Sequence, residues 1–210
     1  MQLKTIQKLG GISIILGALL LLTYSVCFPL CLPLDQVKND FTLLVLNTNW
    51  LWITSVSFFG VIFMIFGFTA VYSTIFSESG LIGFLGYLFV QIAYLLQACK
   101  VTWEIFLYPT IAINKTSQFL LRDLVIKNSS LVTIFRTSAS VTIFLGIILL
   151  CISLMRSKFY PKIAGILIFI GALIYGLGPF LPLIIAISGI FIFSIGCFIL
   201  GLKLMKNNSV

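Results

Sequence analysis

The chain has 210 residues, of which 60% are hydrophobic and 9% are charged, and its mean hydropathy is +1.20. This composition excludes a water-soluble globular domain, in which roughly a quarter of the residues would be charged. The formal net charge of +8 does not indicate a nucleic-acid partner, because the lysines and arginines are scattered in ones and twos and form no basic face. We therefore expect an all-α, polytopic membrane protein that binds no nucleic acid.

Apolar runs of about 18 residues or more with few charges are typical of membrane-spanning helices. The sequence contains six such runs, which leave no room for a separate soluble domain. We predict one transmembrane domain over residues 1–210, a compact bundle with short connections. The six predicted helices cover residues 9–27, 51–76, 81–108, 132–155, 162–178 and 183–203.

The distribution of positive charge predicts the orientation of the bundle. Cytoplasmic connections carry more Lys and Arg than outer ones. With six spans and a cytoplasmic N-terminus, seven of these residues fall inside and four fall in outer loops: Lys4, Lys8, Arg156, Lys158, Lys162, Lys203 and Lys206 against Lys38, Lys115, Arg122 and Lys127. We expect both termini to be cytoplasmic and the protein to be a multi-pass protein of the inner or plasma membrane.

The first apolar run could be mistaken for a secretory signal, because lysines precede it. It is longer than a usual signal core and no A-x-A-like cleavage site follows, so we expect a retained helix. The outer loops should cover 28–50 and 109–131, the first with a short amphipathic segment. Trp50 and Trp52 stand where that loop returns to the membrane, as aromatic interface anchors would. Gly and Pro in 77–80 and 178–182 predict tight turns.

Two pairs of helices resemble each other along the chain. The stretch 8–22, KLGGISIILGALLLL, aligns with 162–176, KIAGILIFIGALIYG, and the spacing of Gly60 and Gly67 recurs in a later helix. Either an internal repeat or convergence on simple apolar sequence explains this. Small residues seven apart predict close helix contacts: Gly10/Gly17, Gly60/Gly67, Ala139/Gly146, Gly171/Gly178 and Gly189/Gly196.

The third predicted helix carries polar residues inside an apolar stretch. Gln97, Lys100, Glu104 and Tyr108 fall within an arc of about 80° on an α-helix, so they form one polar stripe. Pro109 follows them. Because proline has no N–H and clashes with the preceding turn, we expect a helix end there, or a kink that could act as a hinge.

The fourth predicted helix opens with a matching stripe of Thr133, Arg136 and Ser140. Counted inward at ~1.5 Å per residue, Glu104 and Arg136 both lie about 9 Å deep. Two interpretations stay open. One is a structural clamp, in which Lys100 and Arg136 are neutralised by Glu104 or snorkel towards the surface, and the other is an outward-facing polar pocket. Two cations against one acid would suit an anionic ligand or a lipid headgroup.

Residue types needed for common enzyme chemistry are missing. The sequence has no histidine, and its five acidic residues include no pair on one helix face. It has neither a phosphate-binding glycine loop nor a dinucleotide fingerprint. Cys27 and Cys31 could be bridged, redox-active or free, and the other cysteines are expected to be apolar fillers. We expect no cofactor and no metal, and we favour a non-enzymatic protein.

Four stretches of the sequence resemble a group of membrane proteins. Trp50 precedes the second helix, GFTAVYSTIFSESGLIGFLG covers 67–86, Glu104, Pro109 and Ala112 follow, and RSKFYPKIAGILIFIGAL covers 156–173. With these, the chain resembles a group of uncharacterised six-span membrane proteins of bacteria and archaea. The group often has a histidine soon after the tryptophan, where this chain reads LWITSV. The resemblance implies the six-span fold, carries no established activity, and marks Glu104 and Pro109 for testing.

The function that we expect from the sequence is binding. A lipid-binding or small-ligand-binding module, or an accessory subunit of another membrane protein or of a homo-oligomer, would use the polar pocket. The alternative is a small secondary transporter or channel-like protein for an anionic or lipidic solute. A transporter should line a route to both faces with polar groups, and the inner half of the predicted bundle offers few of them.

Overall fold

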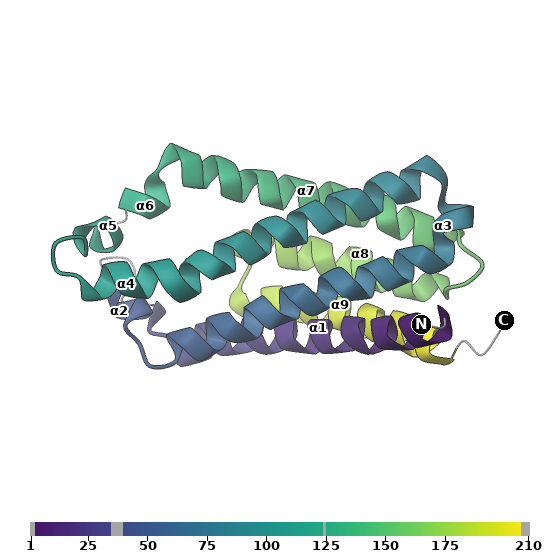
Figure 1. Ribbon diagram of the computed structural model, residues 1–210, viewed down its shortest axis with the longest axis horizontal. Coiled ribbons are helices and arrows are strands. Elements are labelled where there is room, and N and C mark those ends of the chain that lie inside the picture. The colour runs from purple at the N-terminus through teal and green to yellow at the C-terminus, as the bar shows by residue number, and fades with distance from the viewer. Residues whose placement is uncertain (1–2, 35–39, 124, 207–210) are drawn as a thin grey trace.

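A computed structural model of the chain describes residues 3–34, 40–123 and 125–206 (Figure 1). Within these ranges the protein is built from helices and has no β-strand, as predicted. Its elements are α1 (Leu3–Cys31), α2 (Phe41–Val45), α3 (Trp50–Thr102), a π-helical turn (Trp103–Leu107), α4 (Tyr108–Ile113), α5 (Phe119–Arg122), α6 (Val125–Asn128), α7 (Ser130–Arg156), α8 (Lys162–Gly176), a 3₁₀ turn (Gly178–Phe180) and α9 (Leu183–Lys206).

Four helical segments of the described chain are long and apolar enough to cross a membrane: Thr5–Cys31, Trp50–Ile113, Ser130–Arg156 and Leu183–Lys206. The second contains both helices predicted at 51–76 and 81–108, and it bends back on itself between them. The shorter α8 has 15 residues and lies below the usual length of a span.

Gly80 divides α3 into two antiparallel arms, residues 50–79 and 81–102. Its φ of 56° and ψ of −159° break the helix in a conformation that a residue with a Cβ rarely adopts. Tyr72 stacks on Tyr87 across the arms at 4.3 Å between ring centroids. The turn predicted at 77–80 is confirmed, and Figure 1 shows the two arms folding back on each other.

Several predicted helix ends differ from the observed ones by two to four residues. The N-terminal helix was expected at 9–27, but α1 runs through Pro29 to Cys31. The last helix continues three residues beyond the predicted end, to Lys206, and α8 stops at Gly176, two residues early. The predicted amphipathic segment in 28–50 corresponds to α2, while 35–39 lie outside the described residues.

Glycines bring α1 against the first arm of α3. A Cβ on Gly17 would lie 2.9 Å from the backbone nitrogen of Met64, and a Cβ on Gly67 would lie 2.7 Å from the Cα of Ile14. The same contacts recur between α8 and α9, where Gly171 faces Phe193 and Gly196 faces Ile168. The alignment of 8–22 with 162–176 pairs Gly17 with Gly171 and Ile14 with Ile168. The contact register therefore favours an internal repeat over convergence.

The second arm of α3 and α7 form a third hairpin in the same register. Gly86 meets the backbone of Leu150 and Gly146 meets that of Val90. The first helices of the three hairpins read GISIILGAL (11–19), GLIGFLGYL (80–88) and GILIFIGAL (165–173), and their partners read GVIFMIFG (60–67), GIILLCIS (146–153) and GIFIFSIG (189–196). The bundle thus consists of three similar helical hairpins.

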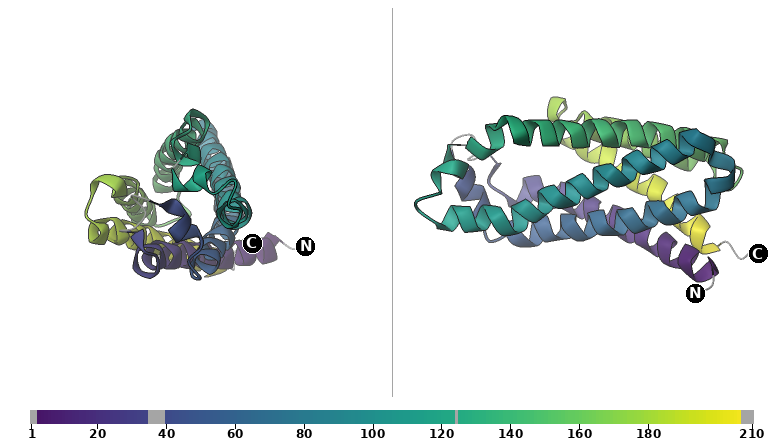
Figure 2. Two further views of the ribbon diagram at one scale, coloured as in Figure 1. Left: turned by 90° about the vertical axis from the view of Figure 1, so that its left-hand side faces the viewer. Right: turned by 45° about the horizontal axis from the view of Figure 1, so that its top comes forward.

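The hairpins pack around one core and present different sides of the bundle. Seen along the axis in Figure 2, α8 and α9 lie on one side, the second arm of α3 with α7 on another, and α1 with the first arm on a third. The last helix packs against the first, and a Cβ added to Gly11 or Gly201 would lie 2.7 Å or 2.6 Å from the carbonyl oxygen of the other glycine. Both termini lie at one end of the bundle, while α2, α4, α5 and α6 gather at the other (Figure 1).

Candidate functional site

A pocket of about 200 Å³ lies at the bundle end away from the termini. The four short helices at this end, α2, α4, α5 and α6, each contribute lining residues, together with α1, α3, the π-turn and α7. The pocket is lined by Tyr24, Phe28, Phe41, Trp50, Lys100, Glu104, Tyr108, Leu120, Leu121, Ile126, Val132 and Arg136.

Four of the seven predicted site residues meet in this pocket: Lys100, Glu104, Tyr108 and Arg136. The other three do not line it. Gln97 is half-buried one helical turn before Glu104's ion-pair partner, and Thr133 and Ser140 lie exposed on α7. The Ser140 hydroxyl donates to the Arg136 carbonyl of its own helix at 3.0 Å. The predicted stripe on the fourth helix therefore contributes only its arginine.

A π-helical turn shapes the floor of the pocket. The Tyr108 N–H donates to the Trp103 carbonyl, five residues back, so the Glu104 carbonyl loses its usual partner. Pro109 has no N–H to replace it. The indole Nε1 of Trp50 donates to this Glu104 carbonyl at 2.8 Å and satisfies it. The predicted helix end at Pro109 is wrong. The π-turn accommodates the missing N–H of the proline, and the helix continues to Ile113.

The buried position of Trp50 corrects its prediction as an interface anchor. Its side chain is 2% exposed, enclosed in a small core cluster at this end of the bundle. Trp52 is 41% exposed and its indole donates to the Asn49 side chain at 3.0 Å, which fits the predicted anchor role. Residues two apart lie on nearly opposite sides of an α-helix, so the Trp50 indole faces inward and the Trp52 indole faces outward.

The carboxylate of Glu104 is the most buried charged group of the pocket. Its Oε1 lies 3.0 Å from the Lys100 Nζ, one helical turn earlier, and its side chain is 10% exposed. Its Oε2 is buried and has no hydrogen-bond partner among the residues that the structure describes. A buried acceptor without a donor is rare in a folded protein. One oxygen of this carboxylate is therefore unpaired.

Arg136 lines the pocket, and of the two alternatives for it, pairing with Glu104 or snorkelling, the described ion pairs do not include the first. The described residues contain two ion pairs, Lys100–Glu104 and Arg122–Asp123. Arg136 is exposed, and the preceding Phe135 packs on Trp103 with 5.0 Å between ring centroids. This contact holds α7 beside the π-turn. Of the two cations, the clamp reading holds for Lys100 alone.

Aromatic rings form a continuous wall that the sequence did not reveal. Phe28 contacts Trp50 at 6.3 Å, and Phe41 contacts both Trp50 and Tyr108 edge-on at 5.9 Å. Tyr24 extends the series through Phe28 at 5.3 Å. Four separate elements, α1 to α4, supply these rings, so only the fold brings them together. Their one sequence signal is the i, i+4 spacing of Tyr24 and Phe28 near the end of α1.

A short helix holds Phe41 over the pocket. Asp40 caps α2, accepting the Thr42 N–H at 2.8 Å. Leu44 and Val45 of α2 are buried in the same small core as Trp50. The predicted amphipathic segment thus serves as one wall of the pocket.

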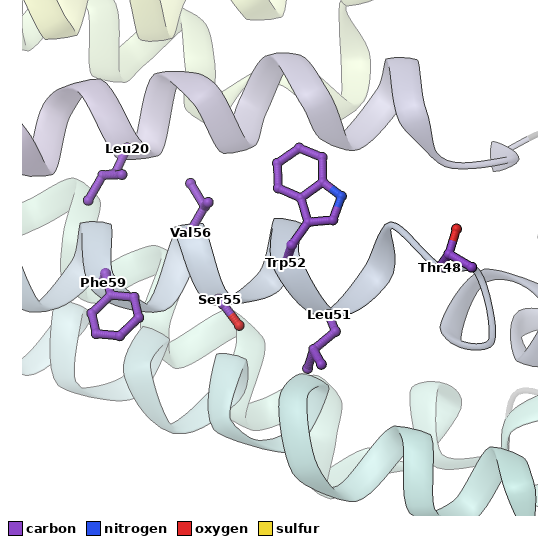
Figure 3. A pocket seen from close by; sticks show the side chains of 7 residues that line it. All are labelled: Leu20, Thr48, Leu51, Trp52, Ser55, Val56 and Phe59. Atoms are coloured by element: carbon purple, nitrogen blue, oxygen red, sulfur yellow. The ribbon is translucent and has the colours of Figure 1, made fainter.

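A second, wider recess of about 550 Å³ lies on the outer face of the first arm of α3, beside α1. Figure 3 shows the Trp52 indole pointing toward α1, while Leu51 and Phe59 point the other way. It is lined by Leu20, Thr48, Leu51, Trp52, Ser55, Val56 and Phe59, none of which is charged. Because charged side chains line only the smaller of these two pockets, the smaller pocket is the candidate site.

The described residues contain no group of three or more His, Cys, Asp or Glu side chains placed to hold a metal ion. All five cysteines are free thiols, so Cys27 and Cys31 are not bridged. Cys151 and Cys197 are buried in the core as predicted, while Cys99 is exposed. The chemistry available in the pocket is recognition by charge, hydrogen bonds and ring faces.

Comparisons of this chain with models of known protein families, with curated protein sequences and with solved structures find no match.

Proposed function

We propose that the chain is a six-span protein of the cell membrane that binds a lipid headgroup or small anionic ligand in the pocket of Glu104, Lys100 and Arg136. Each arm of α3 is long enough to count as a span of its own. With α8, about 22 Å long at 15 residues and extended by the 3₁₀ turn, the spans number six. An even number agrees with both termini at one end.

The charge bias supports a cytoplasmic position for that end. Lys8, Arg156, Lys158, Lys162 and Lys203 are exposed on the described chain and belong to helix ends or turns on the side of the termini. The pocket then opens toward the outer side. An outward site is reached from the outer leaflet or from the surrounding medium.

The observation that carries the binding proposal is the juxtaposition of two cations and one acid in a single small pocket. The net positive charge favours an anion, and the aromatic and aliphatic walls exclude water and strengthen the attraction. Ionisable residues at such depth in a membrane protein are costly and are functional candidates for that reason. Apolar lining residues, Leu120, Ile126 and Val132, favour a lipid headgroup over a fully hydrated solute.

The transporter alternative has weaker support. Gln91, a polar residue of the inner half, donates to the Ile65 carbonyl and to Thr69, which in turn is paired with Tyr87. These bonds lie between the two arms of α3 and are satisfied locally. They offer no series of free polar groups leading from the pocket, so binding or an accessory role fits better.

Native mass spectrometry of the detergent-solubilised protein tests the proposal. Phosphatidylglycerol should be retained by the parent chain and lost, by about tenfold or more in apparent affinity, in Lys100→Met and Arg136→Met. Lys158→Met, at the opposite end of the bundle, is the matched control and should bind normally. Equal retention by all four proteins would contradict a role for this pocket.

A further inference from the structure

The free oxygen of Glu104 narrows the ligand class. Glu104 lines the pocket, and its Oε1 is paired with the Lys100 Nζ at 3.0 Å, whereas its Oε2 is buried and has no donor among the described residues. A purely anionic ligand would leave Oε2 unpaired and would place a second negative charge beside it. The oxygen instead calls for an N–H or O–H donor, and a positively charged donor gives the stronger bond.

The ring wall favours the same kind of group. Tyr24, Phe28, Phe41, Trp50 and Tyr108 surround the space next to Glu104. Aromatic faces attract ammonium groups through their quadrupoles, most strongly where water is excluded. Trp50 cannot donate its indole N–H to a ligand, because Glu104's carbonyl already accepts it. The rings can therefore offer only their faces to an ammonium group, next to a carboxylate.

The cations require that the same ligand also carry a negative group. Lys100 has donors beyond the one facing Oε1, and Arg136 lines the pocket with no carboxylate partner among the described ion pairs. A pocket of about 200 Å³ holds the equivalent of roughly seven waters at ~30 Å³ each. The ligand must therefore bear both charges on a short skeleton.

We propose that the pocket takes an aminoethyl phosphate group, with its primary ammonium on Glu104 Oε2 against the rings and its phosphate on Lys100 and Arg136. A primary ammonium is specified because a quaternary one has no N–H for Oε2. This inference rests on the proposed binding function and adds the amine half of the ligand. The group could belong to phosphatidylethanolamine or to free phosphoethanolamine.

Lipid competition on the purified full chain separates these possibilities. Phosphatidylethanolamine, phosphatidylcholine and phosphatidylglycerol with identical acyl chains are compared by native mass spectrometry. We expect phosphatidylethanolamine to bind about tenfold more tightly than the other two. In Glu104→Gln that preference should disappear while phosphatidylglycerol binding persists. Glu78→Gln, at the opposite end of the bundle, should keep the preference.

Phe41→Leu gives a second variant that leaves every charge in place, should Glu104→Gln fold poorly. It should lower the preference for phosphatidylethanolamine severalfold without changing phosphatidylglycerol binding. Displacement of the lipid by free phosphoethanolamine would identify the headgroup alone as the ligand. Lack of displacement, with the lipid preference intact, would identify the lipid.

The outcomes distinguish this inference from the proposal on which it rests. Equal binding of the three lipids, still lost in Lys100→Met, would overturn the amine site and leave the anion site standing. A preference for phosphatidylethanolamine that survives in Glu104→Gln would also overturn the amine site. If lipid binding does not depend on Lys100 or Arg136, both the amine site and the anion site are overturned.

Discussion

Glu104 has two roles in this structure that depend on different atoms. Its carboxylate faces Lys100 and the pocket, while its backbone carbonyl is held by Trp50 because the π-turn and Pro109 leave that carbonyl without a helix donor. The backbone role fixes where the side chain points. Substitutions of the side chain and of its tryptophan partner should therefore have separable effects.

Glu104→Gln should destabilise the protein by about 1–3 kcal/mol, which corresponds to a fall of roughly 3–8 °C in the unfolding midpoint. The substitution removes the anion beside Lys100, whose side chain is 31% exposed and can turn partly toward water. The measurement is thermal unfolding in detergent. Glu78→Gln is the control, since Glu78 is exposed and accepts the Lys158 N–H.

The double variant Lys100→Gln/Glu104→Gln tests whether the loss comes from the ion pair. If it does, the double variant should be more stable than the sum of the two single changes predicts. Strict additivity would show that Lys100 and Glu104 do not stabilise each other.

Trp50→Phe should cost about 1–3 kcal/mol, because it keeps the ring in the core but leaves the buried Glu104 carbonyl without a donor. The same unfolding experiment measures it, with Trp52→Phe as the matched control on the exposed side of the helix. Equal effects of the two substitutions would refute the structural role of the indole N–H.

The hairpin is the element from which the bundle is built. In all three hairpins the same glycine position admits the partner backbone, as at Gly17, Gly86 and Gly171. Lipid provides little hydrophobic drive for helix association, so close backbone approach at small residues supplies the contact energy. The contacts between neighbouring hairpins are less alike than those within a hairpin. Gly11 lies against α9, whereas the aligned Gly165 lies against α7.

Gly67→Ala and Gly196→Ala should destabilise the protein by similar amounts, about 1–3 kcal/mol each. The new Cβ would lie 2.7 Å from the Ile14 Cα in the first case and 2.9 Å from the Ile168 nitrogen in the second. Gly176→Ala, where nothing lies within 4 Å, should leave the unfolding midpoint unchanged or slightly raised. A large effect at one of the paired positions and none at the other would contradict the repeat.

Apolar length and glycine spacing predicted the helices and one pair of matching hairpins, because both signals are local. The third hairpin was missed because its first helix lacks the lysine start and shares mainly Gly80, Gly86 and Leu88 with the others. Pro109 misled the prediction of a helix end. A π-turn depends on the Trp50 indole, which comes from 54 residues earlier in the sequence.

At the scale of the whole molecule, the pocket and the chain termini occupy opposite ends (Figure 1). The sequence predicted Lys100, Glu104, Tyr108 and Arg136 as neighbours because helical periodicity and one loop sufficed. Apart from Tyr108, it could not supply the aromatic wall, whose other rings come from α1, α2 and the start of α3. The sequence also could not show that Glu104 pairs with Lys100. The position of a residue along its helix does not determine whether Lys100 or Arg136 reaches the carboxylate.

The charge difference between the two ends of the bundle predicts which end faces the cell exterior. Lys115 is exposed in the connection at the pocket end, and Lys158 is exposed in the turn between α7 and α8 at the end of the termini. A membrane-impermeant maleimide applied to intact cells should label Lys115→Cys above the background of the parent chain. Lys158→Cys should be labelled only after the membrane is permeabilised. Each substitution removes one lysine, so the two variants have the same net charge. Labelling of both positions from outside would refute the six-span arrangement, and the reverse pattern would place the pocket on the cytoplasmic face, where the positive-inside bias argues against it.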